Sequence, residues 1–246
     1  MTIAREMMET AMKLRDFTTL TFDVYGTLID WETGLLAQLQ PWLKARGIAV
    51  RDDNLLAEFA RLESQWEAEQ PRLLYPEILE RVHGDLARHF STSPDQQAAR
   101  EFGASVGSWP AFADSREALQ YLARHYRLVV LSNVDRASLG RSAALLGTEF
   151  DLRFTAQDIG SYKPSLANFE YILAHVGEEK GKILHVAQSL FHDHVPASAM
   201  GISSAWIDRR HDKEGGGATL SPKDMPRPAW TYRSLAEFCE AHAAER

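Results

Sequence analysis

The chain of 246 residues contains a single cysteine, Cys239, and no group of cysteines and histidines has the spacing of a zinc site. One thiol excludes an intramolecular disulfide, the bond that stabilises many small secreted domains. We therefore expect a protein of the reducing cytoplasm, with no structural zinc.

Long apolar runs and an excess of basic residues are also missing. No stretch approaches the roughly 20 apolar residues that span a bilayer, so we expect no membrane association. The 27 Lys and Arg are outnumbered by 34 Asp and Glu, which gives a formal net charge of -7. An acidic chain does not attract polyanions, so nucleic acid is not expected as a partner.

The composition that remains, 45% hydrophobic and 25% charged, is typical of a soluble globular protein. The length allows one large domain, or a core domain with an insertion. Residues 1–16 form an N-terminal extension with a helical apolar period, but charged residues interrupt it, unlike the apolar core of a signal peptide. We expect either a surface helix or a contact between the subunits of a homodimer.

Short apolar runs typical of buried strands alternate with helical patterns along most of the chain. Strands are predicted at residues 17–22, 128–131, 150–155, 183–187, 203–207 and 230–232. Parallel strands that are covered by helices on both faces have such continuous apolar runs. The sequence therefore predicts an α/β fold with a doubly wound parallel-sheet (Rossmann-like) core.

The alternation breaks after the first strand, where four helical patterns follow one another at residues 31–46, 54–69, 75–90 and 95–106. A βαβ crossover needs only one helix, so the others indicate an insertion. We predict an α/β core domain formed by residues 17–30 and 109–246, and a helical cap domain formed by residues 31–108. Residues 209–228, rich in glycine and proline, are expected to form a solvated irregular loop near the strand ends.

Polar residues follow several of the predicted strands, at the edge of the sheet where ligands bind in open α/β folds. Asp23 follows the first strand, Ser132 and Asn133 follow the second along the chain, and Ser189 and Asp193 follow the strand at residues 183–187. Each of these residue types is, by itself, as typical of a helix cap or a turn. Their combination is what suggests a site.

The string D-V-Y-G-T-L, which begins at Asp23, resembles the first motif of the haloacid dehalogenase superfamily, whose aspartate is a nucleophile. Ser132, Lys163 and Asp193 match the later motifs in order, so the resemblance extends from residue 17 to about residue 238. Phosphatases of the superfamily carry a general acid where this chain has Tyr25. Where this chain has Gln188 they carry the first of two acids that hold magnesium together with the nucleophile. The chain resembles instead the 2-haloacid dehalogenase (type II) branch, which needs neither metal nor cofactor.

This resemblance implies a hydrolytic dehalogenase that acts on short 2-haloalkanoic acids through an aspartyl-ester intermediate, releasing halide and a 2-hydroxy acid. Asp193 and Ser189 would place the water that opens the ester, and His194 competes with Asp193 as the base. Asp23 would be the nucleophile, and the residues expected to position or stabilise it are Thr27, Ser132, Asn133 and Lys163.

The resemblance also implies how the substrate is held. Backbone amides near Val24 and Tyr25 would bind the substrate carboxylate, with Asn133 and Ser189 beside it. An arginine of the cap should draw off the halide, and Arg61 is the candidate by its place in the second cap helix. It is at least as well explained as an exposed arginine paired with Glu58 or Asn54. Two alternatives stay open: a metal-dependent phosphatase of the same superfamily, and a non-catalytic relative that binds a small acid or a protein.

Overall fold

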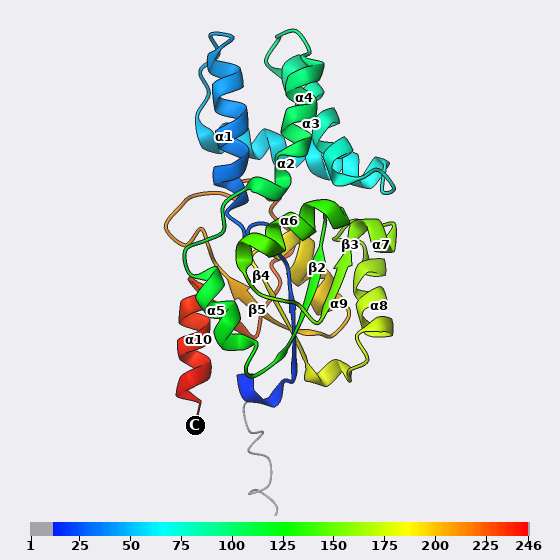
Figure 1. The fold of residues 1–246 in the computed structure, drawn as a ribbon, viewed down its shortest axis with the longest axis vertical. Helices are drawn as coiled ribbons and strands as arrows, with labels where there is room; N and C mark the ends of the chain where they lie inside the picture. Colours follow the sequence, from blue (N-terminus) through cyan, green and yellow to red (C-terminus); the bar gives the residue numbers. More distant parts are fainter. Residues whose placement is uncertain (1–11, 246) are drawn as a thin grey trace, which may run out of the picture.

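The computed structural model describes residues 12–245, and the strands of this range form one parallel sheet with the order β3-β2-β1-β4-β5-β6 (Figure 1). All neighbouring strands are parallel. The predicted doubly wound α/β fold is confirmed. The strands are β1 (Thr19–Phe22), β2 (Arg127–Ser132), β3 (Leu152–Thr155), β4 (Ile183–Ala187), β5 (Ser203–Ile207) and β6 (Trp230–Tyr232).

Side chains that alternate along the strands pack into a separate hydrophobic cluster on each face of the sheet. In β2, Leu128 and Val130 belong to one cluster and Val129 and Leu131 to the other. The first face is covered by α5 (Ser115–Leu122), α6 (Arg136–Leu146) and α10 (Leu235–Ala244). The second is covered by α8 (Leu166–His175) and α9 (Val195–Ala199). Burial on both faces explains the apolar run at residues 128–131 of β2.

The first four α-helices after β1 form a group at one end of the sheet, which we call the cap helices (Figure 1). Aromatic rings hold this group together, since Phe59 packs edge-to-face against both Trp31 and Phe102. The division into domains at residues 31 and 108 stays a prediction. The cap helices are α1 (Trp31–Lys44), α2 (Asp52–Glu69), α3 (Tyr75–His89) and α4 (Gln96–Ala104).

The loop that joins β5 to β6 is irregular, as predicted, but it is not simply solvated. Its Arg210 is buried and forms ion pairs with Glu32 of α1 and Asp53 of α2. Gly217 has a φ of +63°, and a Cβ at this position would lie 1.8 Å from a carboxylate oxygen of Glu32. The loop therefore packs against the cap helices, because its glycines allow the close approach that Arg210 needs.

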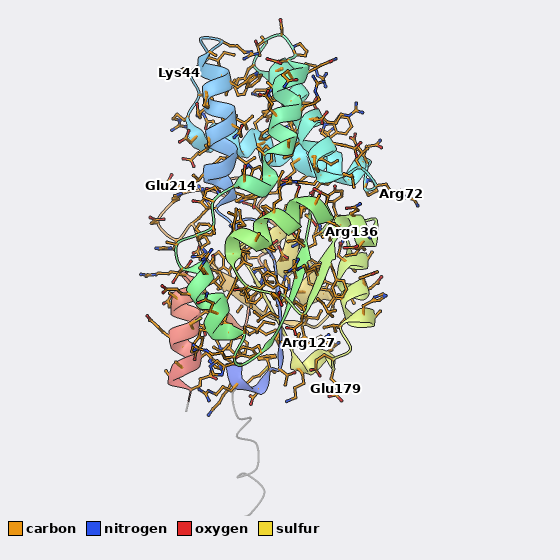
Figure 2. All side chains as sticks on the ribbon, in the orientation of Figure 1. Lys44, Arg72, Arg127, Arg136, Glu179 and Glu214 are labelled. Atoms are coloured by element: carbon orange, nitrogen blue, oxygen red, sulfur yellow. The ribbon has the colours of Figure 1, made fainter. Side chains whose placement is uncertain are left out.

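The described range also contains several short helical elements. The helical period predicted for residues 1–16 lies largely outside the described residues. The first element of the described range is a 3-10 turn at Leu14–Asp16. The short helix α7 (Ala156–Ile159), capped by Thr155, was not predicted. None of the helices within residues 12–245 is long and apolar enough to cross a membrane. Charged side chains such as Lys44, Arg72 and Glu179 extend from the outside of the molecule (Figure 2).

Candidate active site

The turn after β1 is built so that the Asp23 carboxylate faces a small cavity. The Asp23 amide donates to the carbonyl of Val186 in β4 (3.1 Å), and the carbonyl of Val24 accepts from the amides of Thr27, Leu28 and Ile29. Gly26 has a φ of +96°, which other residues rarely adopt. A Cβ there would lie 3.0 Å from the Trp31 ring nitrogen, so the turn also requires glycine for close packing.

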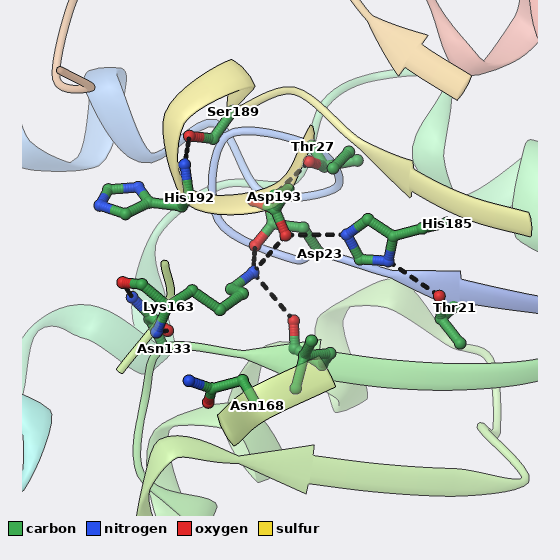
Figure 3. Close-up of polar contacts among 12 residues, drawn as sticks. Thr21, Asp23, Thr27, Asn133, Lys163, Asn168, His185, Ser189, His192 and Asp193 are labelled. Atoms are coloured by element: carbon green, nitrogen blue, oxygen red, sulfur yellow. Dashed lines mark hydrogen bonds and ion pairs between the residues drawn. The ribbon is translucent and has the colours of Figure 1, made fainter. Parts of the chain in front are cut away.

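Lys163 lies between two carboxylates at the centre of the site (Figure 3). Its ammonium is 2.9 Å from Asp23 Oδ1 and 2.7 Å from Asp193 Oδ1, and it also donates to the carbonyl of Leu131 (3.1 Å). Only 1% of this side chain is exposed. Burial by itself would lower the pKa of Lys163, but the two carboxylates raise it above its usual value, so the ammonium stays charged.

The second oxygen of Asp23 accepts a hydrogen bond of 2.6 Å from the hydroxyl of Thr27. That hydroxyl in turn accepts from the backbone amide of Gln188 (2.9 Å), which fixes its proton toward Asp23. Burial raises the pKa of Asp23, while Lys163 and Thr27 act in the opposite direction. The nucleophile predicted from the sequence is thus a carboxylate held from two sides, with its shell of water removed.

Asp193 belongs to a second chain of hydrogen bonds, which begins on β1. The hydroxyl of Thr21 lies 2.8 Å from His185 Nδ1, and His185 Nε2 lies 2.8 Å from Asp193 Oδ1. Burial would raise the pKa of Asp193, but Lys163 and His185 hold it below its usual range. Asp193 Oδ2 is buried and has no hydrogen-bond partner among the described residues. It is the free oxygen at which a water could be activated.

The residues after β2 shape the site in two ways. The Asn133 side chain exchanges hydrogen bonds with the backbone of Lys163, at 2.7 Å and 3.0 Å, and so fixes the loop that carries the ammonium. Ser132 Oγ lines the cavity and finds no partner among the described residues. Ser189 also lines the cavity, and its hydroxyl accepts from the amide of His192. The structure therefore brings together Asp23, Thr27, Ser132, Asn133, Lys163, Ser189 and Asp193.

The cap helices contribute acids to the same cavity. Glu63 and Glu67, one turn apart on α2, are 2% and 4% exposed and line the cavity that contains Asp23 and Asp193. The hydroxyl of Tyr75 donates to Glu63, and the amide of Asn133 lies 3.3 Å from both carboxylate oxygens of Glu67. The cavity, of about 30 Å³, is lined by side chains of both the core and the cap helices.

A family model described as haloacid dehalogenase-like hydrolase matches residues 17–189, more than half of the chain. The chain belongs to this hydrolase family. The chain is also similar in fold to solved structures. No match is found among curated proteins.

The L-2-haloacid dehalogenase from Xanthobacter autotrophicus superposes with a TM-score of 0.77 at 15% identity, covering 94% of this chain and 100% of that chain. The defluorinating L-2-haloacid dehalogenase Rha0230 gives 0.75 at 18% identity, covering 93% and 96%. The putative HAD-hydrolase YfnB from Bacillus subtilis, bound to magnesium, gives 0.73 at 16% identity, covering 92% and 99%. At these identities the similarity establishes the fold alone.

The structure corrects the placement of Arg61 in this haloacid dehalogenase-like hydrolase. Its side chain is 54% exposed and forms an ion pair with Glu58, so Arg61 is the exposed, paired arginine that was the alternative to a halide-binding residue. Glu63 lies two residues further along α2, about 200° around the helix, and faces the cavity instead. The buried stripe of α2 includes Leu56, Phe59 and Glu63. An acid at a position of the helix where the pattern expects an apolar residue was the sequence signal that could have revealed Glu63.

One other predicted residue of the hydrolase, His194, lies outside the cavity, whereas Tyr25 lines it. His194 Nε2 lies 2.9 Å from the carbonyl of Ala187 and its Nδ1 2.9 Å from Ser204, so it does not reach the cavity; burial lowers its pKa to about 4. The Tyr25 hydroxyl is bonded to Ser142 (2.8 Å), and burial raises its pKa. Val24 is fully buried in the turn. His185 was missed, because a histidine inside an apolar strand is usually a core residue.

A divalent metal does not fit these donors well. In the family's phosphatases, acids at the positions of Tyr25 and Gln188 accompany the nucleophile, and here neither is a carboxylate. The ammonium of Lys163 is bonded to both remaining aspartates. Within residues 12–245, no group of three or more His, Cys, Asp and Glu is arranged to hold a metal ion. Magnesium prefers an octahedral shell of hard anionic oxygens, which this set does not offer.

Proposed function

We propose that this hydrolase removes halide from short 2-haloalkanoic acids through an ester formed on Asp23. The observation that carries the proposal is the Lys163 ammonium bonded to both Asp23 and Asp193 beside a small cavity. One carboxylate is available as nucleophile and a second as base, and the cation between them keeps the nucleophile ionised.

In the first step, a carboxylate oxygen of Asp23 attacks the carbon that bears the halogen. A C–O bond forms, the C–halogen bond breaks, and its electron pair leaves with the halide. Thr27 and Lys163 hold Asp23 in position through the hydrogen bonds already described. The substrate carboxylate would contact Ser132 Oγ, which is buried without a partner among the described residues, and the backbone amides near Val24 and Tyr25.

In the second step, water attacks the carbonyl carbon of the Asp23 ester. Asp193 takes a proton from this water through its free Oδ2, and His185 fixes the Asp193 carboxylate from the opposite side. The bond between the Asp23 carbonyl carbon and the alcohol oxygen then breaks, and that oxygen takes the proton held by Asp193 to become the hydroxyl of a 2-hydroxy acid. The cavity of about 30 Å³ has room for only a few water-sized groups, which favours short acids as substrates. The cap helices would have to move away from the core to admit such a substrate.

The test is a single turnover in heavy-oxygen water with the enzyme in excess of 2-chloropropionate. Nucleophilic attack by Asp23 puts the label into the peptide that contains Asp23 and leaves the first product largely unlabelled. Label in the first product, with none in that peptide, would instead mean direct attack by water. Halide release should be unchanged by excess chelator; magnesium-dependent release of phosphate from phosphate esters would replace this proposal with a phosphatase.

The cytoplasm fits such an enzyme, because the lone thiol of Cys239 needs no oxidising compartment. We also propose that residues 31–108 act as a cap domain over the core formed by residues 17–30 and 109–246. Glu63 and Glu67 of the cap helices support this, since they share the cavity with Asp23 of the core.

A further inference from the structure

Glu63 and Glu67 have no role in the steps described so far. Both are almost fully buried, both line the cavity of Asp23, and Glu63 Oε2 has no hydrogen-bond partner among the described residues. A polar atom buried without a partner is costly, so an unpaired carboxyl oxygen at the wall of a cavity points to a ligand that would bind there.

The surroundings of the two acids determine their charge. The one permanent cation among the titratable and polar groups that face them, Lys163, is already bonded to Asp23 and Asp193. Burial lowers the pKa of His192 to about 4, so this ring is neutral near pH 7. The groups that face the pair are Tyr75 of α3, Asn133 after β2, Tyr162 and Lys163 of the loop before α8, His192 and Asp193 after β4, and Asp23.

Two aspartates and one ammonium already leave this cavity with one excess negative charge. Ionising both glutamates would add two more in a place that water barely enters, and like charges so close do not both ionise. Burial raises the pKa of Glu63 to about 8, and burial together with the neighbouring Glu63 raises that of Glu67 well above its usual value. The pair therefore retains at least one proton at neutral pH.

The position of the pair matches that of a leaving group. In a displacement at carbon, the leaving group departs on the side opposite the entering oxygen. The entering oxygen belongs to Asp23, at the end of β1, whereas Glu63 and Glu67 come from α2, at the cap side of the same cavity. Tyr75 donates to one oxygen of Glu63, and the amide of Asn133 contacts both oxygens of Glu67, so Glu63 Oε2 is the oxygen of the pair without a partner among the described residues.

We propose that the Glu63–Glu67 pair donates a hydrogen bond to the departing halide, and that fluoride is the leaving group it favours. The assignment rests on the proposed dehalogenation. Fluoride is the strongest hydrogen-bond acceptor among the halides, so it gains most from a neutral carboxylic acid. The C–F bond breaks with its electron pair on fluoride, the Asp23 ester forms, and the proton remains on the glutamic acid pair. An ionised pair would repel every halide.

The experiment compares fluoroacetate with bromoacetate, by halide release, in wild-type enzyme, Glu67→Leu and Glu67→Gln. Glu67→Leu removes one strong hydrogen bond to a developing anion. Its kcat/KM should therefore fall roughly 10- to 100-fold more for fluoroacetate than for bromoacetate. Glu67→Gln keeps an N–H donor and should fall in between. Glu69→Gln, an exposed acid on the same helix, is the matched control and should leave the ratio of the two substrates unchanged.

The pH profile gives a second readout that a purely structural role would not change. The ratio of fluoroacetate to bromoacetate turnover should fall as pH rises through the pKa of the pair, and this fall should be absent in Glu67→Leu. Equal losses for both substrates in Glu67→Leu, with a flat ratio across pH, would overturn the assignment and leave dehalogenation standing. Absence of halide release from both substrates in wild-type enzyme would overturn the proposed function, and this assignment with it.

Discussion

Both sides of the cavity carry buried acids, but within residues 12–245 the acids of the core side are bonded to a cation and those of the cap side are not. On the core side, Asp23 and Asp193 share the ammonium of Lys163 and are further bonded to Thr27 and His185. On the cap side, Glu63 and Glu67 face each other without a bonded cation among the described residues. Paired carboxylates stay ionised, and unpaired ones keep a proton. One cavity can therefore hold a nucleophile and a hydrogen-bond donor made from the same functional group.

Asp23→Asn tests the core side most directly. The side chain keeps its shape and loses its charge, so turnover should fall by roughly four orders of magnitude or more, as expected for the loss of a nucleophile. Halide release and the melting temperature should be measured together. An active variant with an unchanged fold would contradict the role of Asp23.

Lys163→Met removes the cation that the core side depends on. Two buried carboxylates then lose their partner, and the free energy of unfolding should fall by about 3–5 kcal/mol, along with most of the activity. Denaturation by urea measures the first effect. Arg136→Met is the matched control: it breaks the largely exposed pair with Asp158, which is expected to contribute at most about 1 kcal/mol. Similar losses in the two variants would contradict the distinction between buried and exposed pairs.

Stability should respond to pH in opposite directions on the two sides. The folded-state pKa of Glu63 is raised from 4.5 to about 8, so its contribution is full below pH 4.5 and is lost as pH rises toward 8. The folded-state pKa of Asp193 is lowered, so its contribution is present above pH 3.8 and is lost as pH falls further. One proton changes the free energy of unfolding by about 1.4 kcal/mol per pH unit.

Urea denaturation of Glu63→Gln between pH 5 and 8 checks the cap side. The difference between wild type and variant should shift by a few kcal/mol in favour of the variant as pH rises, because glutamine has no proton to lose. Asp193→Asn should show its pH-dependent difference only below about pH 4. A difference in Glu63→Gln that does not vary with pH would mean that Glu63 is ionised throughout.

Thr21→Val probes the outer end of the core network. It removes one neutral hydrogen bond to His185 and should cost about 1 kcal/mol of stability and less than tenfold in turnover. His185→Phe removes the hydrogen bond to Asp193 itself, so it should lower turnover more than Thr21→Val does. Equal effects would mean that His185 is held by packing alone, for example against Phe169.

The core side could largely be predicted from the sequence, and the cap side could not. Asp23, Ser132 and Asp193 each follow a strand whose apolar run is visible in the sequence, and parallel strands bring their carboxyl ends to one edge. The apolar stripe of α2 indicates that Glu63 is buried, but whether Glu63 and Glu67 reach the cavity depends on how α2 packs over that edge. The error at Arg61 has the same origin, since two residues along a helix turn a side chain to the opposite face.

Arg210 has a consequence for the speed of the enzyme rather than for its chemistry. This arginine comes from the loop before β6, on the core, yet both of its acidic partners, Glu32 and Asp53, belong to cap helices. Any motion that parts the cap helices from this loop to admit substrate must break these ion pairs. Since Asp53 is largely exposed, dissolved salt weakens its pair with Arg210. Higher ionic strength would then raise the rate of substrate entry and leave the rate of bond cleavage unchanged.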